Sequence, residues 1–149
     1  MSTIDFIIYL VIGLAGMEVF SYVFHRFLFH GVLWFIHKTH HSSSSHLFEW
    51  NDLFSAILAF LSIFMIYKGS AHPLHSPLFG IGLGITIYGI GYFFIHDILI
   101  HKRFISLHLR NPLFKKIRKA HQKHHQTIKK KGEEPFGLFM YYNYNKDKD

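Results

Sequence analysis

Three long apolar runs constrain the fold of this chain more than any other feature. They are Phe6 to Phe24, Leu53 to Tyr67 and Leu78 to Ile95. The first run has one formal charge, Glu18, and as a helix it would measure about 28 Å, close to the ~30 Å hydrocarbon core of a bilayer. We therefore expect an all-α integral membrane helical bundle with three or four spans, forming a single domain over residues 1–149.

The flanks of these runs leave some alternatives open. The chain begins MSTID, without the basic residues that open a cleavable signal peptide, so the first run is expected to be retained rather than removed. The second run is short for a span, and a buried soluble helix or a re-entrant segment is the alternative. Asn51 and Asp52 precede this run and are interpreted as helix-capping residues.

Basic residues gather directly after the third run. Between Lys102 and Lys131 there are eleven Lys or Arg and no Asp or Glu. The positive-inside rule places this segment in the cytoplasm, which predicts a bacterial inner-membrane protein with its N-terminus outside. Such a run can bind nucleic acid, but beside a span it favours contact with anionic membrane lipid, so no nucleic-acid partner is expected. The chain has no cysteine, which excludes disulfides and thiolate metal sites.

The histidines repeat in the same order in both halves of the chain. Each half has an HxxxxH motif at the end of an apolar run, followed by an HxxHH motif. This internal repeat predicts an approximate two-fold arrangement of His-rich helices around one cytoplasmic site. The ten histidines are His25, His30, His37, His40 and His41 in the first half and His96, His101, His121, His124 and His125 in the second.

The two motifs differ in how well they suit a regular α-helix. The HxxHH histidines lie at about 0°, 300° and 40° and so share one face, as helix-borne metal ligands do. The HxxxxH histidines would be about 140° apart. Either the helix ends at this motif, or it widens into a π-bulge, or the two histidines approach the site differently. Gly31, which directly follows His30, favours a helix end in the first half.

Ten clustered imidazoles favour metal binding over a solvated histidine surface. Without metal, protonated rings would repel one another, and buried unpaired polar groups would cost about 1–3 kcal/mol each. A transition metal binds neutral imidazole and removes both penalties. Ten ligands exceed what one ion accepts, which predicts a dinuclear site. Imidazole alone does not distinguish iron, zinc, copper and nickel.

The sequence resembles the bacterial β-carotene hydroxylases, within the fatty acid hydroxylase and sterol desaturase superfamily of membrane di-iron proteins. The resemblance runs from GMEVF to FGLF and includes HRFLFHG, HKTHH, FEWNDLFSAILAFLSIFMIY, YGIGYFFIHDILIHKR and AHQKHH. The segment PFGLFMYYNYN departs from the family pattern, because it lacks the usual small-residue opening and the later Ala-Pro.

The resemblance implies a chemistry for these residues. The ten histidines would bind two non-haem iron ions, with O2 as co-substrate and electrons from a ferredoxin-like donor and its reductase. The reaction would be hydroxylation of β-ionone rings at carbon 3, converting β-carotene to β-cryptoxanthin and then zeaxanthin. The apolar carotenoid would enter from the bilayer.

Several other residues are candidates for the site. Glu18, an ionisable group inside a span, and Asp97, beside His96, are the candidate catalytic residues, with a polar-network role favoured for Glu18 over direct ligation. Asp97, Glu49 and Asp52 are candidates to orient a ligating imidazole. His72 and His75 are expected to be bystanders, and His46 and His108 lie outside the motifs. Aromatic residues around the motifs could line a polyene slot or form an interfacial belt: Phe24, Phe27, Phe29, Trp34, Phe35, Tyr92, Phe93 and Phe94.

Other functions remain alternatives. A related di-iron hydroxylase or desaturase could act on another lipid, or a ketolase on the same ring. A non-catalytic membrane metal-binding or metal-transport protein is a third class. Transporters usually place their ligands near mid-membrane, whereas these histidines are expected at one membrane edge, which favours an enzyme.

Overall fold

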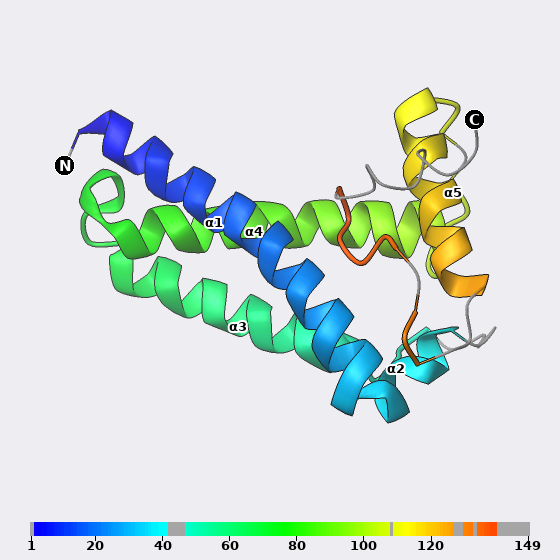
Figure 1. Ribbon diagram of the computed structural model, residues 1–149. Helices are drawn as coiled ribbons and strands as arrows, with labels where there is room; N and C mark the ends of the chain where they lie inside the picture. Colours follow the sequence, from blue (N-terminus) through cyan, green and yellow to red (C-terminus); the bar gives the residue numbers. More distant parts are fainter. Residues whose placement is uncertain (1, 42–46, 108, 127–129, 133, 140–149) are drawn as a thin grey trace. The chain divides into compact units, whose positions relative to one another are not determined.

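The computed structural model describes residues 2–41, 47–107, 109–126, 130–132 and 134–139, and within them the only regular secondary structure is helical. Two of the helices, η1 and η3, are π-helices, and η2 is a short 3-10 helix. The order along the chain (Figure 1) is α1 (Thr3–Val23), η1 (Phe24–Val32), α2 (Trp34–His41), α3 (Asp52–Gly69), η2 (Pro73–His75), α4 (Pro77–Tyr92), η3 (Phe93–Ile100) and α5 (Pro112–Gln126).

Three helical stretches of the described chain are long and apolar enough to cross a membrane. They are Thr3–Val32, Asp52–Gly69 and Pro77–Ile100. The second of these contains the run that looked short in the sequence, and it forms one uninterrupted helix of 18 residues. The expected all-helical membrane protein is confirmed, with three helical stretches among the residues described that are long and apolar enough to be spans.

Contacts along the chain separate two compact units. Unit 1 comprises Met1–Met17 and Asp52–Gly91, and unit 2 comprises Glu18–Asn51 and Tyr92–Asp149. The ten motif histidines all belong to unit 2. The expectation of a single domain over residues 1–149 stays a prediction.

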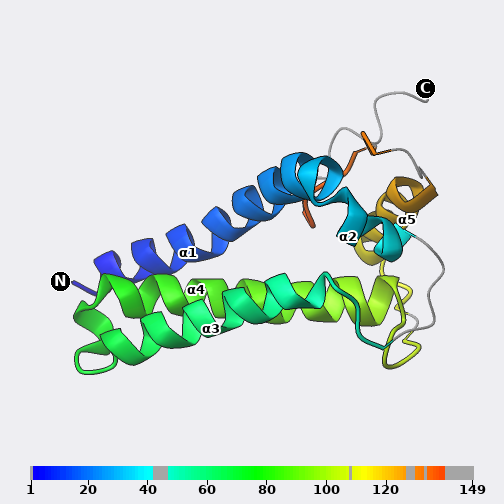
Figure 2. The same cartoon turned by 90° about the horizontal axis from the view of Figure 1, so that it is seen from below.

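Unit 1 is a helical hairpin of α3 and α4, side by side in Figures 1 and 2, together with the N-terminal part of α1. Glycines on α4 allow this helix to approach both α3 and α1 closely. A Cβ at Gly82 would lie 3.0 Å from the Cβ of Met65 on α3, and one at Gly84 would overlap the backbone of α1 at Leu10. Small residues at a helix interface in a membrane let backbones pack closely, because lipid provides no hydrophobic drive for association.

The outward surface of unit 1 suits a lipid environment. Large apolar side chains such as Ile8, Phe60 and Ile63 are half or more exposed, as expected of helices that are hydrophobic all round. The hydroxyls of Ser62 and Thr86 donate to carbonyls of their own helices, at Ala59 and Gly82. A hydroxyl satisfied in this way can lie within the hydrocarbon region at little cost.

Unit 2 repeats one arrangement in its two halves. In each half a π-helix packs against the short helix that carries the HxxHH motif, η1 with α2 and η3 with α5. The hydrophobic core of this unit comes from η3, α5 and the segment after α5. Its members are Ile95, Ile100, Ile117 and Leu138, with Tyr92 and Phe114 packed against them.

Candidate metal centre

The π-helices bring the two histidines of each HxxxxH motif together. In η1 the Leu33 amide donates to the Leu28 carbonyl at 2.8 Å, and after η3 the His101 amide donates to the His96 carbonyl at 2.9 Å. These are i to i−5 hydrogen bonds, which widen the turn and place residues five apart above one another. The ring centroids of His96 and His101 are 4.5 Å apart as a result.

The first half combines two of the alternatives that the sequence left open, the wider turn and the helix end. His25 and His30, with ring centroids 5.1 Å apart, lie within the π-helical turns. Directly after them Gly31 has non-helical dihedral angles, φ −112° and ψ −116°. The helix therefore widens and then ends at Gly31, where the chain changes direction and continues into α2.

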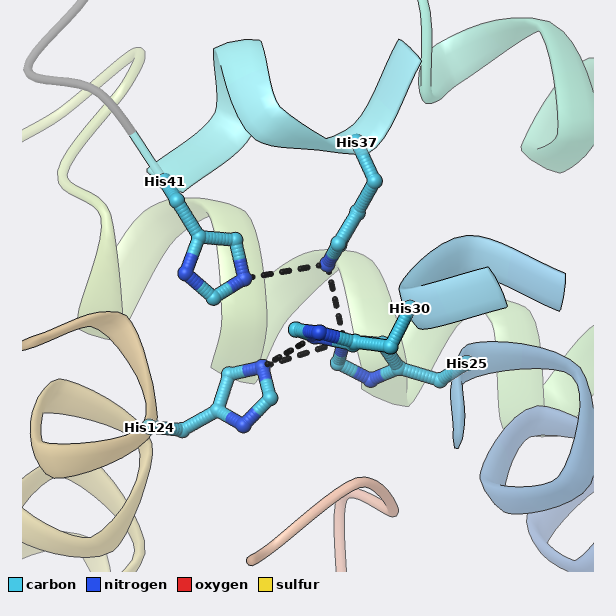
Figure 3. Close-up of side chains that lie close together, drawn as sticks. All are labelled: His25, His30, His37, His41 and His124. Carbon is cyan, nitrogen blue, oxygen red and sulfur yellow. Dashed lines mark hydrogen bonds between the residues drawn. The ribbon is translucent and has the colours of Figure 1, made fainter. Parts of the chain in front are cut away.

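Five imidazoles form the first histidine group (Figure 3). Their ligand atoms all lie within 4.8 Å of one another, and three elements supply them: η1, α2 and α5. His124 from α5 has no exposed surface and His37 from α2 is 2% exposed. The members of the first group are His25, His30, His37, His41 and His124.

Four further imidazoles form the second histidine group, with ligand atoms that also meet within 4.8 Å. The members are His40, His96, His101 and His121. The tenth motif histidine, His125, falls outside both sets, although its ring centroid is 4.5 Å from that of His41 and 4.6 Å from that of His121. Its Nε2 atom is buried and has no hydrogen-bond partner within the described chain.

The two halves of the chain exchange their central HxxHH histidine. His124 belongs by sequence to the second half but joins the first group, and His40 belongs to the first half but joins the second group. The other members of each group come from one half. The approximate two-fold relation expected from the repeat is thus present in how the ligands are distributed.

Within the groups it is the Nε2 atoms that face one another. The Nε2 of His37 lies 2.9 Å from that of His25 and 3.1 Å from that of His41, and those of His101 and His121 are 3.1 Å apart. Two nitrogens bound at right angles to one ion, each about 2.1 Å away, are about 3.0 Å apart. The spacing therefore fits neighbouring ligands of a shared metal ion.

Several Nδ1 atoms face outward to fixed acceptors. The Nδ1 of His25 donates to the Phe136 carbonyl at 2.8 Å, and that of His30 donates to the Lys130 carbonyl at 3.0 Å. A ring that donates from Nδ1 presents an unprotonated Nε2 to the interior. Lone pairs that face one another at about 3 Å repel, and a cation between them removes the repulsion. The donor set and its tautomers fit metal binding.

Carboxylates hold two rings of the second group. The Oε2 atom of Glu49 accepts from Nδ1 of His40 at 2.6 Å, and Oδ1 of Asp97 accepts from Nδ1 of His96 at 2.9 Å. Arg103 donates to Asp97 at 3.2 Å and also to the carbonyl of Leu47. Glu49 and Asp97 occupy the orienting positions that we expected, whereas Arg103 was not anticipated.

Burial lowers the pKa of five of the motif histidines, which favours the neutral ring. Burial, reinforced by neighbouring imidazoles, lowers the pKa of His37 and of His101 to about 2. The same causes lower the pKa of His40 and of His121 well below the usual histidine value, and that of His125 is lowered too. Neutral imidazole is the form that binds metal.

The segment after α5 closes over the first group. The ring of Phe136 lies 5.2 Å, centroid to centroid, from the rings of both His30 and His124. Gly132 has a φ of +61°, and a Cβ there would lie 2.6 Å from Nδ1 of His30, so only glycine suits this position. This segment contacts the group through the Phe136 ring, Gly132 and the carbonyls of Lys130 and Phe136, none of which sequence reasoning identified as part of the site.

Glu18 takes part in the same closure. It is 9% exposed, and its Oε1 atom accepts a hydrogen bond of 2.7 Å from the Phe139 amide. It is a member of neither histidine group. The polar-network role that we favoured agrees with this contact, while a catalytic role for Glu18 or Asp97 stays a prediction.

The aromatic residues around the motifs form two sets, those that contact histidine rings and those that are exposed. Phe29 stacks on His37 with centroids 4.7 Å apart, Tyr92 stacks on His96 at 4.6 Å, and Trp34 packs against His30 at 5.1 Å. By contrast Phe27 and Phe35 are more than 60% exposed. The first three support the histidine rings, and the exposed pair is available to an apolar environment.

The remaining histidines belong to neither group or lie outside the described residues. His72 and His75 are exposed at the turn around η2 and belong to neither group. His46 and His108 lie outside the described residues. Asp52 is the first residue of α3, and Asn51, interpreted from sequence as a cap, instead contacts Nδ1 of His37 at 3.0 Å.

Comparisons with known proteins identify the family of this chain. Residues 10–144 match the model of the fatty acid hydroxylase family. A beta-carotene hydroxylase of Pantoea ananas is 39% identical over 87% of this chain and 73% of its own length. The chain therefore belongs to the fatty acid hydroxylase family.

Plant relatives share the same region of similarity. The chloroplastic beta-carotene 3-hydroxylase 2 of Arabidopsis thaliana is 43% identical over 88% of this chain, and the chloroplastic beta-carotene hydroxylase 1 of Capsicum annuum is 42% identical over 84%. The chain spans 44% and 40% of the length of these two proteins. No solved structure matches the chain.

Proposed function

We propose that the chain is an O2-dependent β-carotene hydroxylase that acts at carbon 3 of the β-ionone rings, giving β-cryptoxanthin and then zeaxanthin. The observation that carries this proposal is the pair of buried histidine groups, each with its ligand nitrogens gathered within 4.8 Å. The names of relatives about 40% identical to the chain support the choice of substrate.

The first group would hold one iron ion and the second group another, with the ten motif histidines as their ligands. In the second half His125 occupies the position that His41 occupies in the first, so we assign it to the second ion. Two bound irons supply the redox chemistry that activates O2, which zinc cannot supply. The first group offers five nitrogens, one more than the four ligands usual for zinc.

The overall reaction is balanced by two electrons. One oxygen atom of O2 enters the C–H bond at carbon 3 to give the alcohol, and the other leaves as water with two protons. The two electrons come from a ferredoxin-like donor and its reductase.

The protein's own side chains fix the ligands and keep water away. Phe29 and Tyr92 cover the faces of His37 and His96, and Glu49 holds His40 by its Nδ1 atom. Rings held in this way need no reorganisation when metal binds, which favours a preorganised site. The candidate catalytic role of Asp97 is to keep His96 oriented while Arg103 holds the carboxylate.

Product analysis in a β-carotene-producing bacterial host tests the activity. Expression of the chain should convert β-carotene to β-cryptoxanthin and zeaxanthin, and a catalytically silent variant, His124→Ala, should leave it unchanged. Appearance of a ketone alone, or of hydroxylated lipid with untouched carotene, would assign the chain to a ketolase or to another lipid hydroxylase.

The proposed topology has the N-terminus outside and the histidine groups on the cytoplasmic face of the bacterial inner membrane. Support comes from the eleven Lys and Arg between Lys102 and Lys131. The chain lacks cysteine, so single cysteines report location without background. In intact cells an impermeant thiol reagent should label Ser70→Cys, in the turn after α3, and should label Lys119→Cys only after lysis; the reverse pattern would invert the topology.

A further inference from the structure

Asn51, directly before α3, contacts a proposed metal ligand through its side chain. Its Nδ2 atom lies 3.0 Å from Nδ1 of His37, and its Oδ1 atom is buried without a hydrogen-bond partner among the described residues. His37 is one of the most buried side chains in unit 2. A buried polar atom without a partner is unfavourable, and rotation of the amide exchanges which of its two atoms, oxygen or nitrogen, faces His37.

The amide nitrogen and oxygen have nearly the same shape, and the surrounding hydrogen bonds decide which one faces a neighbour. If Nδ2 faces His37, Nδ1 is an acceptor and the ring's only proton sits on Nε2. That proton would then point at the Nε2 atoms of His25 and His41, 2.9 Å and 3.1 Å away. If Oδ1 faces His37 instead, it accepts from Nδ1–H and Nε2 is left with its lone pair.

The other ligand rings favour the second orientation. Four of them point Nδ1 at an oxygen that can only accept: the carbonyls of Phe136 and Lys130, and the carboxylates of Glu49 and Asp97. With Oδ1 toward His37, Asn51 becomes a fifth acceptor of the same kind and its buried oxygen gains a partner. The rotation therefore removes the proton conflict at Nε2 of His37 and gives Oδ1 a partner, while Nδ2 takes the position that Oδ1 held.

We infer that Asn51 is a positioning residue, which holds His37 by its Nδ1–H and so keeps the Nε2 atom of that ring available to metal. This inference rests on the proposed metal-binding function of the first histidine group. Acceptors behind ligating histidines typically change metal affinity 10- to 100-fold. Asn51 is expected to act on binding of the first ion and to leave the second group unaffected.

Three proteins test this role in detergent: wild type, Asn51→Asp and Asn51→Leu. Aspartate keeps an acceptor of the same size, whereas leucine keeps the bulk and removes the acceptor. Each purified protein is loaded with Fe²⁺ without oxygen and titrated with a chelator. The number of iron ions retained per protein is then measured. We expect wild type and Asn51→Asp to hold two ions tightly, and Asn51→Leu to release one ion at a 10- to 100-fold lower chelator concentration.

Spectra of the same proteins loaded with Co²⁺ give a second readout that a merely structural role would not move. The visible bands of cobalt should change for one ion in Asn51→Leu and be recovered in Asn51→Asp. Equal retention by Asn51→Leu and wild type, or weaker binding in Asn51→Asp than in Asn51→Leu, would overturn the inference. Wild-type protein that bound no iron would instead overturn the proposed metal centre.

Discussion

The Nε2 atom of His124 lies 3.1 Å from the Nε2 atom of His25, although 99 positions separate the two residues in the chain. His25 belongs to η1 and His124 to α5. The first histidine group therefore depends on contact between the two halves of unit 2. His40 makes the reciprocal connection, with its ring centroid 4.5 Å from that of His101.

Replacement of either exchanged histidine should deplete one ion and abolish turnover. We expect His124→Ala to lose metal from the first group and His40→Ala from the second, each retaining about one equivalent of the two, with hydroxylated product undetectable. Metal analysis of purified protein and product analysis in a carotene-making host check this. His75→Ala, at the exposed turn around η2, is the matched control and should behave as wild type. Full turnover by His124→Ala would refute the ligand assignment.

Acidification should destabilise the metal-free protein. The folded state keeps His37 and His101 neutral until their pKa of about 2, whereas the unfolded chain protonates both near pH 6.5. Between these values the unfolded state binds more protons, so stability falls as pH falls, by about 1.4 kcal/mol per pH unit for each such histidine. Above pH 6.5 the two histidines are neutral in both the folded and the unfolded state, so this pH dependence vanishes.

Thermal unfolding in detergent at pH 7.5, 6.5 and 5.5 measures this dependence. The unfolding midpoint should be similar at the two higher values and clearly lower at pH 5.5. His101→Gln should reduce the slope, because one titrating ring is removed. A midpoint that did not change at pH 5.5 would contradict the neutral, buried state of these rings.

Glu18 should hold the segment after α5 in place. Glu18→Leu removes the side-chain acceptor of the Phe139 amide, while Glu18→Gln keeps an acceptor oxygen. Hydrogen–deuterium exchange of the peptide containing Phe139 should be at least tenfold faster in Glu18→Leu and close to wild type in Glu18→Gln. Unchanged exchange in both variants would mean that this hydrogen bond does not limit opening.

The close contact of α4 with α1 can be tested with a single methyl group. Gly84→Ala places a Cβ against the backbone of Leu10, whereas Gly89→Ala, on the same helix, meets nothing within 4 Å. Overpacking of this kind typically costs about 1–3 kcal/mol. Thermal unfolding in detergent should show a lower midpoint for Gly84→Ala and an unchanged or slightly higher one for Gly89→Ala, since alanine favours helix. Equal midpoints would argue against the tight interface.

Local patterns in the sequence predicted the helices and most of the proposed ligands. Apolar run length gave the spans, and the spacing of HxxHH placed His121, His124 and His125 on one helix. The π-helical turns at His25 and His96 were predicted only as one of three alternatives, because a regular helix separates positions five apart and nothing local specifies the wider turn.

Other features of the site could not be read from local patterns. The exchange of His40 and His124 depends on how two distant helices meet. Lys130 and Phe136 act through backbone carbonyls, which every residue has, so their identity carries no signal. Asn51 stands where a helix cap belongs and was interpreted as one, but its amide faces His37. Glu49 and Asp97 were predicted because a carboxylate near a histidine motif is a recognisable pair.

The exchange of central histidines between halves also limits when the site can mature. A nascent chain that has emerged only as far as α4 contains four of the five first-group imidazoles and one of the second, so neither set is complete. Both histidine groups can be completed only after α5 has left the ribosome and folded. Loading of the two proposed iron ions would therefore follow the synthesis of α5, instead of accompanying the insertion of the first spans.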